Sequence, residues 1–222
     1  MTCKSIVFLF SFFLFSLCAA QTKKRVIIFG DSITELGVKP DGFISIMKDS
    51  LHKKKLADKY ELIGAGISSN KIYDLFLRLE KDVVSRDPSL VFIWIGVNDV
   101  WHKSLLGTGT DADKFEIFYQ AIISRLREKK ITVVLCTPAV VGEKWDATNE
   151  LDGALNKYAA IIRGLAEKNN CPLIDFRKIF QAYSIEHNKS NKESGVLTYD
   201  KVHLNKTGNG LVAATLFRYL TE

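Results

Sequence analysis

Short apolar runs alternate with longer amphipathic stretches along this sequence. The first run, Val26 to Phe29, contains no polar break, which is typical of a strand buried on both faces of a sheet. Five strands are expected, near residues 26–29, 62–66, 90–95, 131–135 and 171–176. Each ends close to a Gly, Asn, Asp or Pro residue, which are the residues that favour turns. The pattern therefore predicts a sheet whose strands are separated by other elements.

Between these runs, apolar residues recur at the spacing of one helix face. Helices are expected near residues 41–54, 70–80, 115–126, 148–169, 178–183 and 206–220. Strands that alternate with helices form βαβ units, which give parallel sheets with right-handed crossovers. We therefore expect one α/β domain, a flavodoxin-like three-layer α/β/α sandwich with a five-stranded parallel sheet of order 2-1-3-4-5.

The first 20 residues have the pattern of a secretory signal peptide. Lys4 precedes an apolar run over residues 6–17, and Cys18-Ala19-Ala20 offers small residues for cleavage before Gln21. The run is about a dozen residues long, short of the ~20 that a membrane-spanning helix needs. We expect a secreted or periplasmic protein with its domain at residues 21–222 and no stable membrane span. Acylation of Cys18 in a lipoprotein is the second interpretation.

The chain of 222 residues has a formal net charge of +6, and its basic clusters lie at residues 52–55 and 127–130. Each cluster falls at the C-terminal end of an expected helix, where cations complement the helix dipole. No aromatic interleaving or nucleic-acid motif accompanies them, so we expect no nucleic-acid partner.

Two cysteines, Cys136 and Cys171, remain after the signal peptide. They fall at opposite ends of two expected neighbouring strands, on the order of 15 Å apart, beyond the ~7 Å that a disulfide can bridge. We predict two free, largely buried thiols.

Three strand ends bear residues suited to acyl transfer. Ser32 follows the first strand, Gly66 ends the second, and Asn98 follows the third. In a sheet of order 2-1-3-4-5 these ends are neighbours and share one crevice. Ser32 is a candidate nucleophile, and the backbone N–H groups of Ser32 and Gly66 with the Asn98 amide are candidate oxyanion donors. Alone, a serine after a strand is more often a turn residue or a helix cap.

A histidine must act as the base in such a site, and the chain has four: His52, His102, His187 and His203. His203 is favoured because Asp200, three residues earlier, can orient its imidazole. His102 is the rival base. It lies with Trp101 close after Asn98, and we expect Trp101 and His102 to shape the substrate pocket.

Four short blocks resemble those of the SGNH (GDSL-like) hydrolase family: Gly30-Asp31-Ser32-Ile33, Gly66, Gly96-x-Asn98-Asp99 and Asp200-x-x-His203. The resemblance implies a flavodoxin-like fold, Ser32 as nucleophile, Gly66 and Asn98 in the oxyanion hole, and His203 with Asp200 completing a triad. Two departures stand out. Ile33 replaces the leucine of the family name, and Ile67-Ser68-Ser69 follows Gly66 where many relatives have another glycine.

These observations lead us to expect a secreted serine esterase that uses no metal and no cofactor. Its partner is expected to be a small ester with a short acyl group, such as an O-acetyl carbohydrate. The alternatives are a lysophospholipase or thioesterase acting on lipid-like esters, and an inactive binding module of the same fold. A nucleotide binder that uses Asp31 or Asp99 for a metal is disfavoured, because no Gly-rich phosphate loop is present. Both carboxylates are expected to brace loops instead.

Overall fold

The computed structural model describes residues 23–222, so the predicted signal peptide lies outside the described residues. Its centre is a five-stranded parallel sheet of order β2-β1-β3-β4-β5. The strands are β1 (Lys24–Gly30), β2 (Tyr60–Gly66), β3 (Leu90–Trp94), β4 (Thr132–Cys136) and β5 (Leu173–Ile174). The fold class and strand order predicted from the sequence are confirmed.

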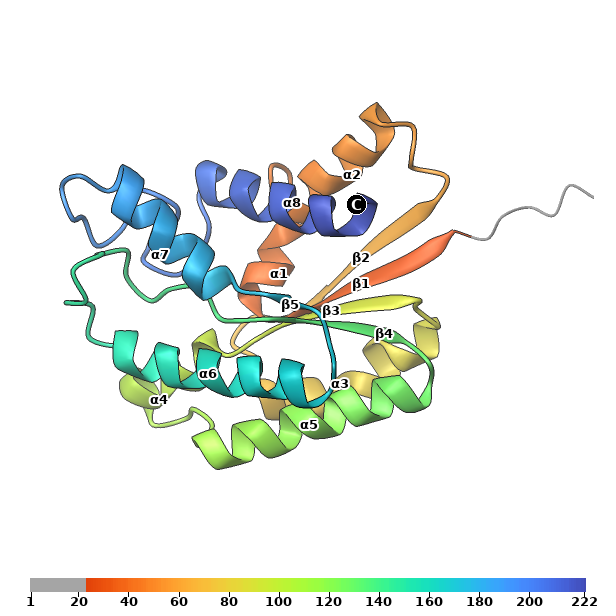
Figure 1. The fold of residues 1–222 in the computed structure, drawn as a ribbon, viewed down its shortest axis with the longest axis horizontal. Helices are drawn as coiled ribbons and strands as arrows, with labels where there is room; N and C mark the ends of the chain where they lie inside the picture. Colours follow the sequence, from red (N-terminus) through yellow and green to blue (C-terminus); the bar gives the residue numbers. More distant parts are fainter. Residues whose placement is uncertain (1–22) are drawn as a thin grey trace, which may run out of the picture.

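Helices cover both faces of this sheet (Figure 1). One face carries α1 (Ser32–Gly37), α2 (Phe43–Lys53), α7 (Phe176–His187) and α8 (Lys206–Thr221). The other carries α3 (Ile72–Asp82), α4 (Val97–Leu106), α5 (Ala112–Glu128) and α6 (Asp152–Lys168), with a short 3₁₀ turn, η1 (Val84–Arg86), after α3. Within residues 23–222, no helix combines the length and the apolar character needed to cross a bilayer.

The unbroken apolar run of β1 supplies two separate cores. Val26 and Ile28 pack on the side of α2 and α8, whereas Ile27 and Phe29 pack on the side of α3 and α5. All four side chains are at most 1% exposed. Because successive strand residues point to opposite faces, a strand covered on both sides must be apolar at every position.

The structure contains two helices that the sequence pattern did not predict, α1 and α4. Each begins directly after a strand and is too short for an apolar stripe to repeat. The Asp31 carboxylate caps α1 by accepting a hydrogen bond from Ile33 N at 3.0 Å. α4 lies between Gly96 and Gly107, which have φ values of 124° and 70°. The two helices therefore start at the same edge of the sheet.

The end of the chain also differs from the expectation. β5 spans only Leu173–Ile174 instead of 171–176, and α7 extends over Phe176–His187 instead of 178–183. The Asp175 carboxylate accepts a hydrogen bond from Lys178 N and begins the helix there. The last helix, α8, lies close to its predicted position.

Both cysteines of the described domain are free, as predicted. Cys136 is buried, and burial raises the pKa of its thiol. Cys171 is only half-buried, which corrects the expectation that both thiols are largely buried. It lies in the turn before β5, nearer the surface than the strand itself.

Candidate active site

The parallel register aligns the carboxyl ends of three strands. Gly30 of β1 lies opposite Gly66 of β2 and opposite Trp94 of β3. Ser32 and Asn98 follow β1 and β3 on the first turns of α1 and α4. The structure therefore brings these residues to one edge of the sheet, as the strand order requires.

Ser32 is hydrogen-bonded to His203, the histidine that the sequence favoured. Ser32 Oγ lies 2.9 Å from His203 Nε2, and His203 Nδ1 lies 2.6 Å from Asp200 Oδ2. The carboxylate can only accept, so the Nδ1 proton faces Asp200 and Nε2 accepts from Ser32. Ser32 is 8% exposed. The ring of Tyr199 stacks on His203 at a centroid distance of 5.8 Å.

Asp200 and His203 lie at the tip of a short hairpin. Thr198 and Leu204 form an antiparallel bridge at its base. Asp200 Oδ1 accepts hydrogen bonds from Val202 N at 3.1 Å and His203 N at 2.7 Å, which leaves Oδ2 for the imidazole. Burial raises the pKa of Asp200, but its hydrogen bonds with His203 and Val202 outweigh burial and lower it. Asp200 is therefore an anion at neutral pH.

Asn98, a predicted oxyanion donor, is 2% exposed on the first turn of α4. Its side-chain amide donates a hydrogen bond to Asn70 O at 3.1 Å. An amide nitrogen has two hydrogens, so the second remains for another acceptor. Asn70 lies in the loop after Gly66, and Asn98 thereby joins the ends of β2 and β3.

Gly66, the other predicted donor, packs directly against α1. A Cβ atom at this position would lie 2.2 Å from Glu35 N and 2.6 Å from Asp31 O. These are backbone atoms, so no side-chain movement relieves the contact. The glycine is needed because β2 approaches the helix that begins with Ser32.

We expect Gly66→Ala to destabilise the protein by about 1–3 kcal/mol, the usual cost of inserting a methyl group into packed surroundings. Activity should fall as well, since the clash displaces α1. Thermal unfolding and aryl acetate hydrolysis measure the two effects. Gly164→Ala is the matched control, because a Cβ at Gly164 meets nothing within 4 Å. Equal behaviour of the two variants would contradict this account of Gly66.

The loop after Gly66 has a bracing that the sequence did not reveal. Glu35 accepts hydrogen bonds from the backbone and hydroxyl of Ser68, at 2.5 and 2.6 Å. Ser69, the last residue of the Ile67-Ser68-Ser69 stretch, has a left-handed φ of 66°. The Ile67-Ser68-Ser69 stretch, although it lacks the glycine of many relatives, therefore forms a hydrogen-bonded turn.

Arg78 of α3 ties the strand ends to this loop. Its guanidinium donates to Gly30 O at 2.8 Å, to Ala65 O at 3.0 Å and to Asn70 Oδ1 at 2.7 Å. Charged donors make stronger hydrogen bonds than neutral ones. One side chain thus fixes the backbone just before Ser32, the backbone just before Gly66, and the partner of Asn98.

Asp31 and Asp99 are buried carboxyl groups that brace backbone, as the sequence suggested. Asp31 caps α1, and Asp99 Oδ1 accepts from Ile72 N at 3.1 Å. Asp99 Oδ2 is buried without a hydrogen-bond partner in the described part of the chain. Burial raises the pKa of Asp31 to about 6 and that of Asp99 to about 7. The two carboxyl groups also repel each other, whereas Lys71 favours the ionised form of Asp99.

This burial predicts a pH-dependent stability. The pKa of Asp99 is about 7 in the fold, against 3.8 for an ordinary exposed aspartate. Between about pH 4 and pH 7 the folded state therefore holds a proton that the unfolded state has lost. The contribution of Asp99 to the free energy of unfolding is complete below that window and is lost as pH rises through it. The loss is ~1.4 kcal/mol for each pH unit over which the folded state holds one proton more than the unfolded state.

Asp99→Asn should remove this part of the pH dependence. The variant is expected to gain stability relative to the wild type as pH rises from 4 to 8, as measured by chemical denaturation. The slope contributed by Asp31 should remain. A stability difference that does not change with pH would show that Asp99 is ionised in the folded protein.

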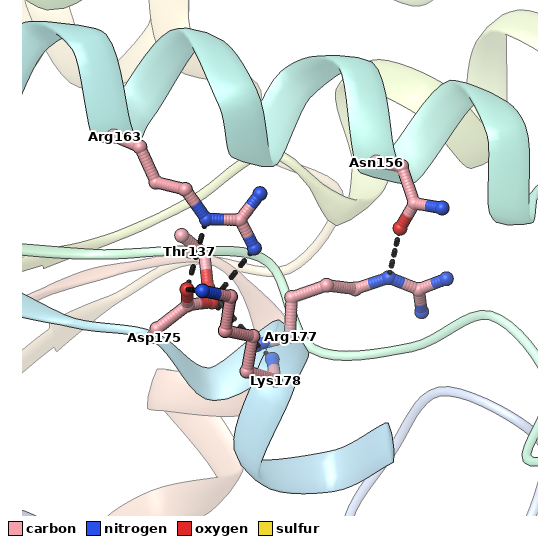
Figure 2. A network of polar contacts seen from close by, with 6 residues as sticks. All are labelled: Thr137, Asn156, Arg163, Asp175, Arg177 and Lys178. Carbon is pink, nitrogen blue, oxygen red and sulfur yellow. Dashed lines mark hydrogen bonds and ion pairs between the residues drawn. The ribbon is translucent and has the colours of Figure 1, made fainter. Parts of the chain in front are cut away.

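A polar network anchors the segment that connects β4 to α6 (Figure 2). Arg163 of α6 makes two hydrogen bonds with Asp175, at 2.8 and 3.0 Å. Thr137, directly after β4, donates to Asp175 at 3.0 Å and accepts from Arg177 N at 2.9 Å. Arg177 also donates to Asn156 of α6 at 2.8 Å. The first residue after β4 is therefore held to α6 and α7.

From this anchored segment, Glu143 reaches the loop that precedes the Asp200–His203 hairpin. Glu143 is 1% exposed. Its carboxylate accepts three backbone hydrogen bonds, from Val196 N at 2.8 Å, Leu197 N at 2.7 Å and Thr198 N at 2.5 Å. A buried carboxylate so satisfied fixes the backbone that donates to it.

A cavity of about 370 Å³ opens beside the hairpin. We name it the α4 groove, and its walls include Trp101, Leu105, Val141, Glu150, Glu193 and Lys201. Trp101 lines this cavity, whereas His102 is not among the lining residues; that the two residues shape the substrate pocket stays a prediction. His102 is half-buried, and burial and then the charge of Lys71 lower its pKa.

Arg78 and Glu143 are the site residues that sequence reasoning missed. Neither belongs to a catalytic motif, and Arg78 reaches Gly30 and Glu143 reaches residues 196–198 across long separations in the chain. In residues 23–222, no group of three or more His, Cys, Asp or Glu side chains is placed to hold a metal ion.

Comparisons with known proteins agree on the family. The sequence model of the GDSL-like Lipase/Acylhydrolase family matches residues 28–211. The crystal structure of an acetyl xylan esterase, AlAXEase, is 56% identical with a TM-score of 0.88, covering 88% of this chain and 99% of that chain. An acetylxylan esterase of Geobacillus stearothermophilus is 23% identical over 211 residues, 88% of this chain and 93% of its own.

A solved structure with lower identity supports the fold alone. LAE5, an alpha/beta hydrolase from the metagenome of Lake Arreo in Spain, is 23% identical with a TM-score of 0.77, covering 88% of this chain and 94% of its own. The family match covers most of the chain and agrees with the four sequence blocks. The chain belongs to the GDSL-like lipase/acylhydrolase family and is a carboxylic-ester hydrolase.

Proposed function

We propose that this protein is a serine esterase that removes acetyl groups from carbohydrate hydroxyls, with Ser32, His203 and Asp200 as its catalytic triad. The observation that supports this most directly is the continuous chain of hydrogen bonds from Ser32 Oγ through the imidazole to Asp200, at 2.9 and 2.6 Å. This is the arrangement that activates a serine hydroxyl for attack on an ester.

In the proposed mechanism, Ser32 Oγ attacks the ester carbonyl carbon while His203 Nε2 takes its proton. The oxyanion is stabilised by the backbone N–H groups of Ser32 and Gly66 and by the Asn98 amide. Collapse expels the sugar alkoxide, which receives the proton from His203 and leaves as a free hydroxyl. Water then attacks the acetyl-enzyme with His203 again as base, and acetate departs.

Two observations support an acetylated carbohydrate as the substrate. The structural relative that is 56% identical is described as an acetyl xylan esterase. The α4 groove, which includes Lys201 of the Asp200–His203 hairpin, combines an indole with charged side chains, which suits a hydroxylated partner. Export is part of the proposal, resting on the signal-peptide pattern of residues 1–20.

The test measures acetate release from acetylated xylo-oligosaccharides and from an aryl ester series of increasing acyl length. We expect acetate release from the glycan and a steep fall in rate beyond short acyl groups. Efficient hydrolysis of long acyl esters with no release from the glycan would favour a lipid acylhydrolase instead.

A further inference from the structure

The α4 groove is lined by residues that are close in the chain to two groups of the proposed catalytic centre, Asn98 and Asp200. Along α4, Asn98, Trp101 and Leu105 are spaced by three and four residues and therefore lie on one face of the helix. Trp101 and Leu105 line the groove, and Trp101 is one turn of helix beyond Asn98. Another lining residue, Lys201, follows Asp200 directly in the hairpin. A group bound in the groove would lie next to an ester held at Ser32.

The walls of the groove differ in chemistry. Trp101 is half-buried and packs against the core, whereas Leu105 is 63% exposed. Together they make an apolar strip on α4. Two other lining residues, Glu193 and Lys201, form an ion pair at 2.8 Å, with about half of each side chain exposed. Glu150 adds a further carboxylate.

This combination fits a sugar ring better than an acyl chain. A sugar in its ring form has a face of C–H groups, which packs on an aromatic ring, and a rim of hydroxyls, which both donate and accept hydrogen bonds. Burying an alkyl chain there would desolvate the charged groups of Glu150, Glu193 and Lys201 without compensation.

We propose that the α4 groove is the subsite for the sugar of the leaving alcohol, with Trp101 as its platform and the Glu193–Lys201 pair as its hydroxyl-binding wall. The inference rests on the proposed function and adds the location and the residues that select a glycan. The acetyl group then occupies the side of Ser32 toward Asn98, and the sugar extends along α4.

Trp101→Ala tests the subsite. The measured quantity is the ratio of kcat/KM on acetylated xylo-oligosaccharide to kcat/KM on an aryl acetate, whose small leaving group cannot fill the groove. We expect this ratio to fall about tenfold or more, as for the loss of one aromatic anchor. Trp101→Phe should recover part of it. Trp145→Ala is the matched control: Trp145 is 48% exposed in the β4 to α6 segment and is not a lining residue, so its ratio should not change.

Two further measurements keep the test decisive. Leu105 is exposed, so Leu105→Ala should fold normally. It should also lower the ratio, and it therefore tests the subsite even if Trp101→Ala does not fold. Unacetylated xylo-oligosaccharide should also inhibit aryl acetate hydrolysis by the wild type, and less so in Leu105→Ala. A wild type that deacetylates the glycan with unchanged ratios in both variants would overturn the subsite and leave the proposed function standing. A wild type that hydrolyses the aryl acetate but no glycan would overturn the proposed function and the subsite together.

Discussion

Replacing Ser32 with alanine is expected to reduce aryl acetate hydrolysis by about 10⁴-fold or more, the order of loss seen when a serine triad loses its nucleophile. The substitution removes only the Ser32 hydroxyl group and its hydrogen bond with His203. The cap of α1 is provided by Asp31 and stays intact. Initial-rate kinetics and thermal unfolding should therefore show an inactive, folded protein.

The histidine variants separate the proposed base from its rival. His203→Ala should lose activity to a similar extent as Ser32→Ala, because the three groups act as one unit. His102→Ala should cost far less, since the hydrogen bond of Ser32 Oγ goes to His203 and His102 lies outside the groove. A fluorophosphonate should label Ser32 in the wild type and fail to label Ser32→Ala. Full turnover by Ser32→Ala would refute the triad.

The sheet could be predicted from the sequence because its central strands, β1 and β3, contain unbroken apolar runs. The first strand, with Val26 to Phe29 buried on both faces, leaves no alternative to a covered parallel sheet. Helix periodicity is a less reliable guide to whether residues at the edge of an apolar stripe face the core. The spacing places Phe76 on the inner face of α3, but Phe76 is 39% exposed and its ring contacts Phe118 of α5 at 5.4 Å, whereas Phe118 itself packs against the core.

The short helices α1 and α4 escaped prediction for a different reason. Six and ten residues long, they offer too few turns for an apolar stripe to repeat, and they start without a break after a strand. What marks them is capping, by Asp31 for α1 and by the glycines at both ends of α4. These caps are local signals that a periodicity search passes over.

In the site, contacts between residues close in the sequence could be predicted, whereas contacts between distant residues could not. Asp200 and His203 are three residues apart, so a turn can join them and their pairing can be read from the sequence. Arg78, in contrast, bonds to Gly30, 48 positions away, and Glu143 bonds to backbone 53 to 55 positions away. Spacing carries no information about such partners, because only the folded sheet brings them together.

Glu143 is the remote contact whose loss should matter most. Its three acceptor bonds go to consecutive N–H groups that lead directly into the Asp200–His203 hairpin. In Glu143→Gln, one carboxylate oxygen becomes an NH₂ group, which must face a backbone donor. A buried donor left unpaired costs ~1–3 kcal/mol, so the loop should loosen at the base of the hairpin.

We expect Glu143→Gln to lower kcat on an aryl acetate by about tenfold to a hundredfold, with a smaller change in KM. The chemistry depends on the placement of His203 against Ser32, and small displacements of a catalytic group are costly. Unfolding should also occur at a lower temperature. Steady-state kinetics across pH would show whether the apparent pKa of the base in the free enzyme shifts with the loop.

A matched variant separates positioning from plain stability. Tyr119→Phe removes one buried hydrogen bond, from the phenol to Ile93 O at 3.2 Å, on the α5 side of the sheet. It should lower stability by ~1 kcal/mol while leaving kcat and the pH profile as in the wild type. If Glu143→Gln behaved the same way, Glu143 would hold the fold together without setting the geometry of the base. A fall in kcat confined to Glu143→Gln would show that Glu143 positions His203. It would do so from another loop, because its carboxylate fixes the backbone from which the hairpin extends toward Ser32.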